Sequence, residues 1–412
     1  MLAARSLAPA TRSLASTAAA LARARSLTDA LFRQVRPEAI FDRPIPERHR
    51  ILFYIGHLEA FDWNQIARSC LGLGPLNPEL DKLFAFGIDP PMGQSPNDRP
   101  EDWPTPAQTR EYVHDVRRRL DLLLEHARDQ PLQIAIEHRL MHAETFSYIL
   151  HNLPYGRRHL ESHQAAPYGP SPATEMIAIP SGQATLGRRR GQGFGWDNEF
   201  VAHSKSVPAF AISKYKISNA DYLKFVKDGG PAPHYWSNRE GKWFYRGMGA
   251  EIPLPENWPV YVNQIQAESY AQWIGKSLPS EEQFHRAAYG TPEGNELDYP
   301  WGSAPPQSLH GNFDFHHSDA VSVTSHPLGD SAFGVSQLVG NGWEWTSSPF
   351  EPFPGFEPFA SYPGYSKDFF DGDHFVLKGG SCATDAQLLR ASFRNWYRRD
   401  YPYAYATFRV VD

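Results

Sequence analysis

The first third of the chain repeats apolar residues with the period of an α-helix. Leu27, Leu31 and Val35 follow one another at intervals of four residues. The same spacing of apolar positions runs through 50–72 and 106–129. Because residues three and four apart lie on one face of a helix, each segment predicts a helix with an apolar face directed at a core.

A fourth helix is expected over 132–153, where Pro154-Tyr155-Gly156 ends it. Four helices of this length pack as an antiparallel bundle. Pro, Gly and Asn are frequent in 75–106, which we expect to be a long ordered loop between the second and third helices. The sequence therefore predicts a helical domain over 29–156.

The pattern changes after the predicted bundle. Residues 157–175 have the composition of a linker, and 177–180 start a short strand. From there on Gly, Trp, Asn and Pro interrupt the chain every few residues, and helical spacing returns only over 267–274 and 280–289. We therefore expect a multidomain protein, in which an α domain precedes an irregular α+β domain over 176–412.

The segment 1–28 contains no Asp or Glu but carries four arginines and several serines. That composition is found in organellar targeting peptides. Ala and Leu also recur at helical spacing, which favours the alternative that 1–28 is an Ala-rich first helix of the N-terminal domain. We expect the helix, and the sequence leaves a targeting segment open.

Composition and net charge argue against a nucleic-acid-binding protein, a membrane protein and a disulfide-rich protein. The net charge of −6 gives no basic face for phosphate, so no nucleic-acid partner is expected. No apolar run approaches the ~20 residues that span a bilayer, so we expect no membrane segment. The two cysteines, Cys70 and Cys382, cannot make a disulfide framework or a thiolate metal site, and they favour a reducing, cytoplasmic location.

Histidines at metal-ligand spacing give the first chemical signal. His138 and His142 are four residues apart in the fourth predicted helix, so both imidazoles can face one ion. His57 stands among apolar neighbours in an earlier helix, and the helices of a bundle present inward side chains to a common core. Three imidazoles suit Fe, Zn, Cu or Ni and leave open coordination positions. By spacing alone, histidines that are solvated or satisfied within the core are the more common explanation.

Five motifs stand in order along the second half of the chain. They are Phe194-Gly195-Trp196-Asp197-Asn198-Glu199, Leu278-Pro279-Ser280-Glu281-Glu282, Gly340-Asn341-Gly342-Trp343-Glu344-Trp345, Lys378-Gly379-Gly380-Ser381 and Phe393-Arg394-Asn395-Trp396. As a set they resemble the domain shared by formylglycine-generating enzymes and the ergothioneine synthase EgtB, over roughly 175–412. The resemblance implies an irregular, C-type-lectin-like α+β fold of the sulfatase-modifying-factor type.

The first half resembles the DinB-like bundle that precedes this domain in EgtB, in the ovothiol enzyme OvoA and in the selenoneine synthase SenA. In those enzymes an early His and a His-x3-His pair bind iron(II), and the matching positions are His57, His138 and His142. The resemblance therefore implies an Fe(II) cofactor. Formylglycine-generating enzymes instead need a cysteine pair near the C-terminus, which Cys382 alone cannot supply.

The same resemblance assigns roles in the second domain. The sequence around Tyr362 and Tyr365 is similar to the loop that carries the catalytic tyrosine of bacterial EgtB, which makes Tyr362 the expected catalytic phenol and Tyr365 a substrate-facing tyrosine. The alternative is that both are packing aromatics of a Pro-rich loop. Asn395 and Trp396 match the pair that lines the betaine pocket of EgtB. A Trp face holds a trimethylammonium group by cation–π attraction, which fits hercynine, the trimethylated histidine.

Two positions depart from EgtB. Trp103 and Tyr397 stand where EgtB members that use a thiol dipeptide carry Arg and Asp, so groups that would pair with a charged donor are missing. The sequence around His142 is closer to OvoA and SenA, and the chain has no room for the methyltransferase domain usual in OvoA. We therefore expect a SenA-like enzyme that uses O2 to join selenium from a seleno-sugar to C2 of hercynine, with Trp103 and Tyr397 contacting the donor.

Three alternatives stay open at this point. The first is an ergothioneine-type sulfoxide synthase that takes cysteine or γ-glutamylcysteine. The second is an ovothiol-type sulfoxide synthase. The third is a DinB-type binding module without catalysis, for which no bound metal is expected. The sequence fixes neither the donor nor the oligomeric state.

Overall fold

The computed structural model describes residues 14–87, 97–159 and 166–412. The chain divides into two compact units, and each is described by itself. The first unit takes in Met1–Leu160 and Arg190–Phe194, and the second takes in Glu161–Arg189 and Gly195–Asp412.

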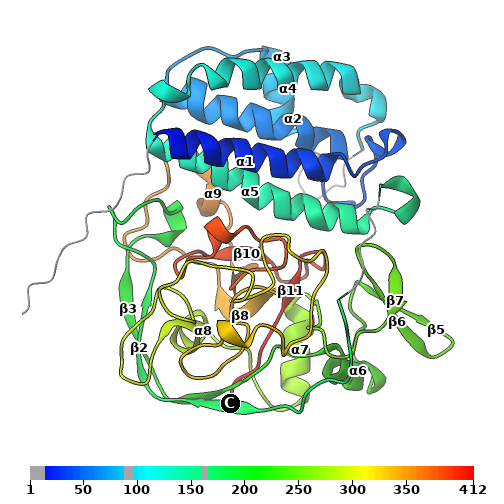
Figure 1. Ribbon diagram of the computed structural model, residues 1–412, viewed down its shortest axis with the longest axis vertical. Helices are drawn as coiled ribbons and strands as arrows, with labels where there is room; N and C mark the ends of the chain where they lie inside the picture. Colours follow the sequence, from blue (N-terminus) through cyan, green and yellow to red (C-terminus); the bar gives the residue numbers. More distant parts are fainter. Residues whose placement is uncertain (1–13, 88–96, 160–165) are drawn as a thin grey trace, which may run out of the picture. The chain divides into compact units, whose positions relative to one another are not determined.

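The first unit is a helical bundle, as the apolar periodicity predicts. Figure 1 shows α1, α2, α4 and α5 running along one another. Helix α1 packs on α5, and α2 packs on both α4 and α5. The elements are α1 (Leu14–Phe32), α2 (Ile51–Asp62), the π-helix η2 (Trp63–Cys70), α3 (Pro78–Phe86), α4 (Pro106–Asp121) and α5 (Asp129–Asn152), with 3-10 turns at Pro37–Ala39, Pro100–Asp102, Leu124–His126 and Tyr155–Arg157.

The predicted loop over 75–106 is wrong in part, because it contains helix α3. Asn77 caps this helix by accepting a hydrogen bond at 3.1 Å from the backbone N–H three residues on, and Pro78 occupies the first turn. Gly87 ends the helix in a left-handed conformation, with a φ of 74°. Asn, Pro and Gly act here as start and stop signals. Residues 88–96 of the predicted loop lie outside the described residues.

Helix boundaries also differ from the expected ones. The helix predicted over 50–72 is α-helical only to Asp62 and continues as the π-helix η2. The helix predicted over 106–129 stops at Asp121, and α5 begins at Asp129 with Pro131 in its first turn. Helix α1 runs without a break across residue 28, so the expected boundary there falls inside a helix.

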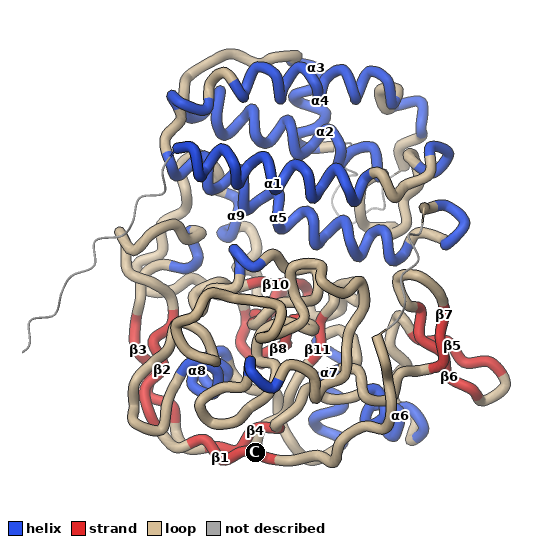
Figure 2. The backbone as a smooth tube through the Cα atoms, in the orientation of Figure 1, coloured by secondary structure: helices blue, strands red, loops and turns tan. Residues whose placement is uncertain are grey.

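The second unit is an α+β domain with much loop between short strands, as Figure 2 shows. The strands pair as β1–β4, as β2–β3, as β5–β6–β7 and in the four-stranded order β10–β9–β8–β11, where β11 is parallel to β8. Their bounds are β1 (Met176–Ile179), β2 (Gly182–Leu186), β3 (His203–Val207), β4 (Phe210–Ser213), β5 (Trp236–Arg239), β6 (Lys242–Arg246), β7 (Glu251–Pro253), β8 (Trp343–Pro349), β9 (His374–Lys378), β10 (Asn395–Arg398) and β11 (Ala406–Thr407).

The helices of the second unit are α6 (Asn219–Lys227), α7 (Gln264–Trp273), α8 (Glu281–Tyr289) and α9 (Gly364–Lys367). Helices α7 and α8 confirm the two that the spacing predicts, and each begins with a capping box. Helix α6 was not expected, and its start is capped by the Ser218 hydroxyl, which accepts from the N–H of Asp221. None of the helices in the described ranges of either unit is long and apolar enough to cross a bilayer.

Candidate metal centre

Three histidines converge between α2 and α5. His57 comes from α2, and His138 and His142 stand one turn apart on α5. One ring nitrogen of each lies within 4.8 Å of those of the other two. The ring of His57 is centred 5.2 Å from that of His138 and 4.9 Å from that of His142, and the α5 pair is 4.4 Å apart. The structure thus brings together the three histidines that the sequence singles out.

Aromatic rings fix the orientation of two of these imidazoles. Phe61 stacks on His138 with 3.4 Å between ring centroids and 8° between ring planes. Phe53 stacks on His57 at 4.7 Å and 27°. Both phenylalanines lie one helical turn from His57 on α2, so the same apolar face that packs α2 into the bundle also holds the ligand rings.

A backbone carbonyl sets the tautomer of His57. The Nδ1 atom of His57 lies 2.7 Å from the carbonyl oxygen of Phe84 in α3. A carbonyl oxygen can only accept, so Nδ1 carries the proton and Nε2 presents its lone pair. Metal-ligating histidines are commonly oriented in this way by a contact on the other ring nitrogen. Sequence analysis missed Phe84, because its contribution is a backbone atom of an unexpected helix.

Helix α3 approaches α2 closely enough for this contact because residue 56 is glycine. A Cβ atom at Gly56 would lie 2.4 Å from the Phe84 ring, which is itself fully buried. Helix α3 is also held by Asp81, whose carboxylate accepts the hydroxyl of Tyr112 in α4 at 2.7 Å. Gly56, next to His57 in the sequence, is therefore a signal that could have pointed to a close helix contact at the site.

Burial keeps the three imidazoles neutral. It lowers the pKa of His57 to about 4 and lowers the pKa values of His138 and His142 well below their ordinary range. The buried Nδ1 of His142 has no hydrogen-bond partner among the residues that the structure describes. Neutral imidazoles, one buried and two partly buried, fit a divalent transition metal, and three protein ligands leave further positions for substrates.

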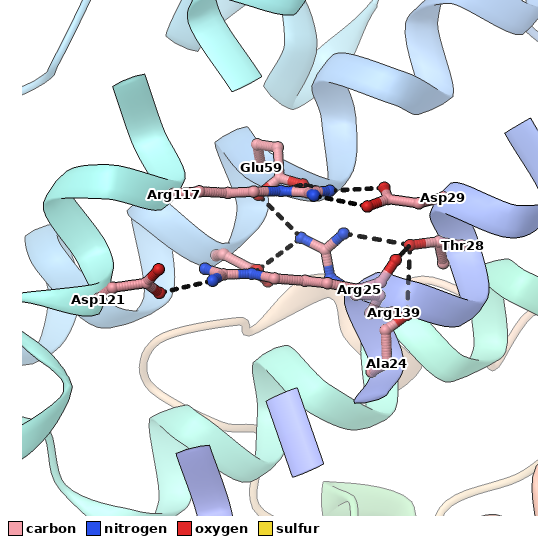
Figure 3. Close-up of polar contacts among 9 residues, drawn as sticks. Ala24, Arg25, Thr28, Asp29, Glu59, Arg117, Asp121 and Arg139 are labelled. Atoms are coloured by element: carbon pink, nitrogen blue, oxygen red, sulfur yellow. Dashed lines mark hydrogen bonds and ion pairs between the residues drawn. The ribbon is translucent and has the colours of Figure 1, made fainter. Parts of the chain in front are cut away.

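The same two helices also carry a buried ion-pair network, shown in Figure 3. Arg139, next to His138, lies 2.6 Å from Asp62 and 3.1 Å from Glu59 of α2. Arg117 of α4 contacts Glu59 at 2.7 Å and also binds Asp29 of α1 through two hydrogen bonds. Burial opposes ionisation of Glu59, but Arg139 and Arg117 outweigh it and hold the pKa of Glu59 below its ordinary value. The network ties together four helices, which fixes α5 against α2 beside the histidines.

In the second unit, aromatic residues gather where the resemblance predicts a substrate pocket. Trp396 of β10 stacks on Phe350 at 4.2 Å and 8°, and the ring of Tyr365 meets it edge-on at 5.2 Å. The ring of Tyr362 lies 5.5 Å from that of Tyr365. The Asn395 side chain accepts the backbone N–H of Trp396 at 2.9 Å. Four of the predicted substrate and catalytic residues are therefore neighbours within this unit.

Trp103 and Tyr397, the expected donor contacts, lie in different units. Trp103 is 6% exposed, and its indole N–H donates to Asp98 at 2.7 Å, so its polar atom is engaged within the bundle. Tyr397 stacks on Tyr401 at 5.1 Å with nearly parallel rings. Their role towards a donor stays a prediction.

Family models match both units of the chain. The one described as a sulfatase-modifying factor enzyme 1-like domain matches residues 162–412. The one described as the DinB superfamily matches residues 20–161. The expected order of a DinB-like helical domain and a formylglycine-generating-enzyme-like α+β domain is confirmed.

Curated relatives match the chain at moderate identity. A protein named hercynine oxygenase from Mycolicibacterium thermoresistibile is 36% identical over 323 residues, which cover 71% of this chain and 72% of that protein. Another of that name from Mycolicibacterium smegmatis is 35% identical over 362 residues, or 78% of this chain and 81% of that protein. Ergothioneine biosynthesis protein 1 from Schizosaccharomyces pombe is 29% identical over 421 residues, or 89% of this chain and 52% of that protein.

Proposed function

The chain belongs to the family of the hercynine oxygenases, and we propose on that basis that it is an iron(II)- and O2-dependent enzyme that joins a chalcogen to C2 of the hercynine imidazole. The chalcogen is selenium or sulfur. Membership of this family makes the chain an oxidoreductase, so the alternative of a DinB-type binding module without catalysis is not supported.

One observation supports the metal part of the proposal above all others. His57, His138 and His142 are the one group of at least three His, Cys, Asp or Glu side chains at metal-ligand distances within the described ranges. They would hold iron(II) through three neutral imidazoles. When bound, iron(II) supplies the activation of O2, which amino-acid side chains do not provide. Because the three ligands are uncharged, the ion keeps its full positive charge and favours an anionic thiolate or selenolate.

The aromatic residues of the second unit would bind hercynine and supply a proton. Trp396 offers an indole face, braced by Phe350, for the trimethylammonium group. Tyr362 would donate the proton of its Oη. Burial raises the pKa of Tyr362 to about 12, and the nearby Asp197 charge adds to the shift, so the phenol keeps its proton at neutral pH.

The donor that we favour is a seleno-sugar. Trp103 and Tyr397 replace the Arg and Asp of thiol-dipeptide users, and neutral aromatic residues cannot pair with the carboxylates of γ-glutamylcysteine. Aromatic faces can stack on a sugar ring. A sulfur donor is the second candidate, and the names of the relatives favour it. With a thiol, the atoms balance when O2 ends as one sulfoxide oxygen and one water.

Steady-state kinetics with each donor tests the choice. We expect kcat/KM for the seleno-sugar to exceed that for γ-glutamylcysteine by about tenfold or more, equivalent to about 1.4 kcal/mol. The double variant Trp103→Arg/Tyr397→Asp should narrow this ratio. Equal use of both donors by the unmodified protein, or a preference for γ-glutamylcysteine, would place the chain with the sulfoxide synthases.

A further inference from the structure

Two buried carboxylates of the second unit have different surroundings, although both belong to the 3-10 helix η6 (Asp197–Glu199). Glu199 is paired with a cation, because Arg390 donates to it through Nε at 2.8 Å and Ser392 adds its hydroxyl at 2.6 Å. Asp197 is 1% exposed and forms no ion pair with any residue that the structure describes. Because charge pairing does not stabilise the buried Asp197 carboxylate, other interactions must do so.

The Asp197 carboxylate accepts from the backbone N–H of the neighbouring Asn198 and from two residues of one distant segment, the tyrosine turn (Phe359–Ser366). The hydroxyl of Ser366 donates to Asp197 Oδ1 at 2.5 Å. The backbone N–H of Phe359 donates to the same carboxylate. Asn198 supports the contact, because its side-chain amide donates to the Ser366 hydroxyl at 2.9 Å. The carboxylate thus binds the first and the last residue of the turn.

Tyr362 lies between these two anchors. Two backbone bonds lie within the turn, from the N–H of Tyr362 to the carbonyl of Phe359 at 3.1 Å and from the N–H of Tyr365 to the carbonyl of Tyr362 at 3.2 Å. Trp196, the residue before Asp197, stacks on Tyr365 with 3.9 Å between ring centroids. Residues of η6 and the neighbouring Trp196 therefore contact the turn at its first residue, its last residue and Tyr365.

We infer that Asp197 is the positioning residue of the Tyr362 phenol, because its carboxylate anchors both ends of the tyrosine turn. The inference rests on the proposed function, in which Tyr362 donates the proton. Burial raises the pKa of Asp197, and the Asp197 charge helps to raise that of Tyr362, so the anchor also favours the protonated phenol. Glu199, with its own arginine, binds none of the turn's anchors and has a structural role.

Hydrogen exchange tests the anchor without any assay of activity. In Asp197→Ala and Ser366→Ala, amides of the tyrosine turn should exchange at least about tenfold faster, while peptides of β8 and β9 stay unchanged. Asp197→Asn keeps an acceptor oxygen and should restore most of the protection. Ser392→Ala is the matched control, because it removes one hydroxyl donor from the neighbouring carboxylate, and it should leave the turn protected. Unchanged exchange in Asp197→Ala would overturn the inference, as would faster exchange throughout the unit.

A double-mutant cycle tests the link to the phenol. Asp197→Ala should lower kcat for hercynine oxidation on the order of tenfold or more, with KM for hercynine within about twofold. In a Tyr362→Phe background the same change should have little further effect, because it acts through the missing phenol. If the fold losses in kcat of Asp197→Ala and Tyr362→Phe multiply in the double variant, the two residues act independently. That result would overturn the positioning role while leaving the proposed function intact. Full activity of Tyr362→Phe, or no hercynine oxidation by the unmodified protein, would instead overturn the function proposed for Tyr362 and the inference with it.

Discussion

Helices α2 and α5 carry two buried polar clusters that differ in how their groups are satisfied. In the ion-pair network, Arg139 meets Glu59 and Asp62 at hydrogen-bonding or ion-pair distance, and arginines from α1 and α4 complete it. The histidine cluster, with His138 beside Arg139 in the sequence, consists of neutral bases only. The first cluster contains its own counterions, whereas the second brings three ring nitrogens within 4.8 Å of one another, at the distances of metal ligands.

This difference assigns the two clusters different roles in the bundle, because charge pairing suits a role in stability and neutral bases suit a role in binding. A cluster of opposite charges from four helices pairs within itself and holds these helices together. Three neutral ring nitrogens do not stabilise one another, and their spacing fits a metal ion as a common partner. The network therefore holds α5 against α2, and the histidines are the proposed metal ligands.

Removing a metal ligand should have the largest effect on activity. His138→Ala or His142→Ala should abolish iron binding and all detectable turnover, because two imidazoles do not retain a catalytic ion. The helical content should stay at the level of the unmodified protein. Elemental analysis, circular dichroism and an activity assay on the same preparation measure these outcomes. Turnover at the normal rate by an iron-free variant would remove the metal assignment.

Breaking the ion-pair network should have the largest effect on stability. Arg139→Ala leaves Glu59 and Asp62 buried without their main cation, which costs about 3–5 kcal/mol of unfolding free energy. Arg118→Ala is the control, since its pair with Asp115 is exposed and is worth at most about 1 kcal/mol. Urea titrations of the metal-free proteins measure both. A loss below about 1 kcal/mol for Arg139→Ala would show that the network does not hold the bundle.

A substitution at the contact between α3 and α2 should have a smaller effect, and it should change both stability and iron affinity. Gly56→Ala would gain about 0.5–1 kcal/mol from helix propensity, but the clash with Phe84 should cost about 1–3 kcal/mol and displace the carbonyl that orients His57. We expect iron affinity to fall about 10- to 100-fold. Gly74→Ala, which meets no atom within 4 Å, is the control for equilibrium dialysis. A more stable Gly56→Ala protein with normal affinity would refute the close contact.

The smallest effect is expected for His285, a buried histidine outside both clusters, and it concerns the pH dependence of stability. Burial and the charge of Lys378 lower the pKa of His285 to about 3, against about 6.5 in the unfolded chain. Between these values the unfolded state binds more protons, so stability falls as the pH drops below 6.5. The unmodified protein should lose unfolding free energy as the pH falls from 7.5 to 5.5, and in His285→Phe this loss should be smaller by about 1 kcal/mol. Identical pH profiles for the two proteins would contradict the lowered pKa.

Part of this picture is predictable from the sequence, and the physical reason is periodicity. Leu27, Leu31 and Val35 show that a helix faces a core, and the four-residue interval between His138 and His142 places both rings on one face. Both inferences need only local geometry. Capping residues of α7 and α8 are local in the same sense, and those helices were expected.

The parts that the sequence did not predict depend on contacts between distant segments. The contact of His57 uses a backbone atom 27 residues away, in a helix whose Asn77 and Gly87 had been interpreted as loop residues. The contact of Asp197 with Ser366 spans 169 residues. No periodicity or spacing encodes such pairs, because they arise only when the chain has folded.

The most direct test of the account is the dependence of one reaction on iron, O2 and the histidines. Purified metal-free protein is loaded with iron(II) under anaerobic conditions and mixed with hercynine and a seleno-sugar or thiol donor, and O2 is then admitted. Mass spectrometry should detect a product that contains hercynine joined to the chalcogen, and this product should be missing without iron, without O2 and with His138→Ala. A product formed equally well by the iron-free protein, or no product with any donor from fully iron-loaded protein, would contradict the account.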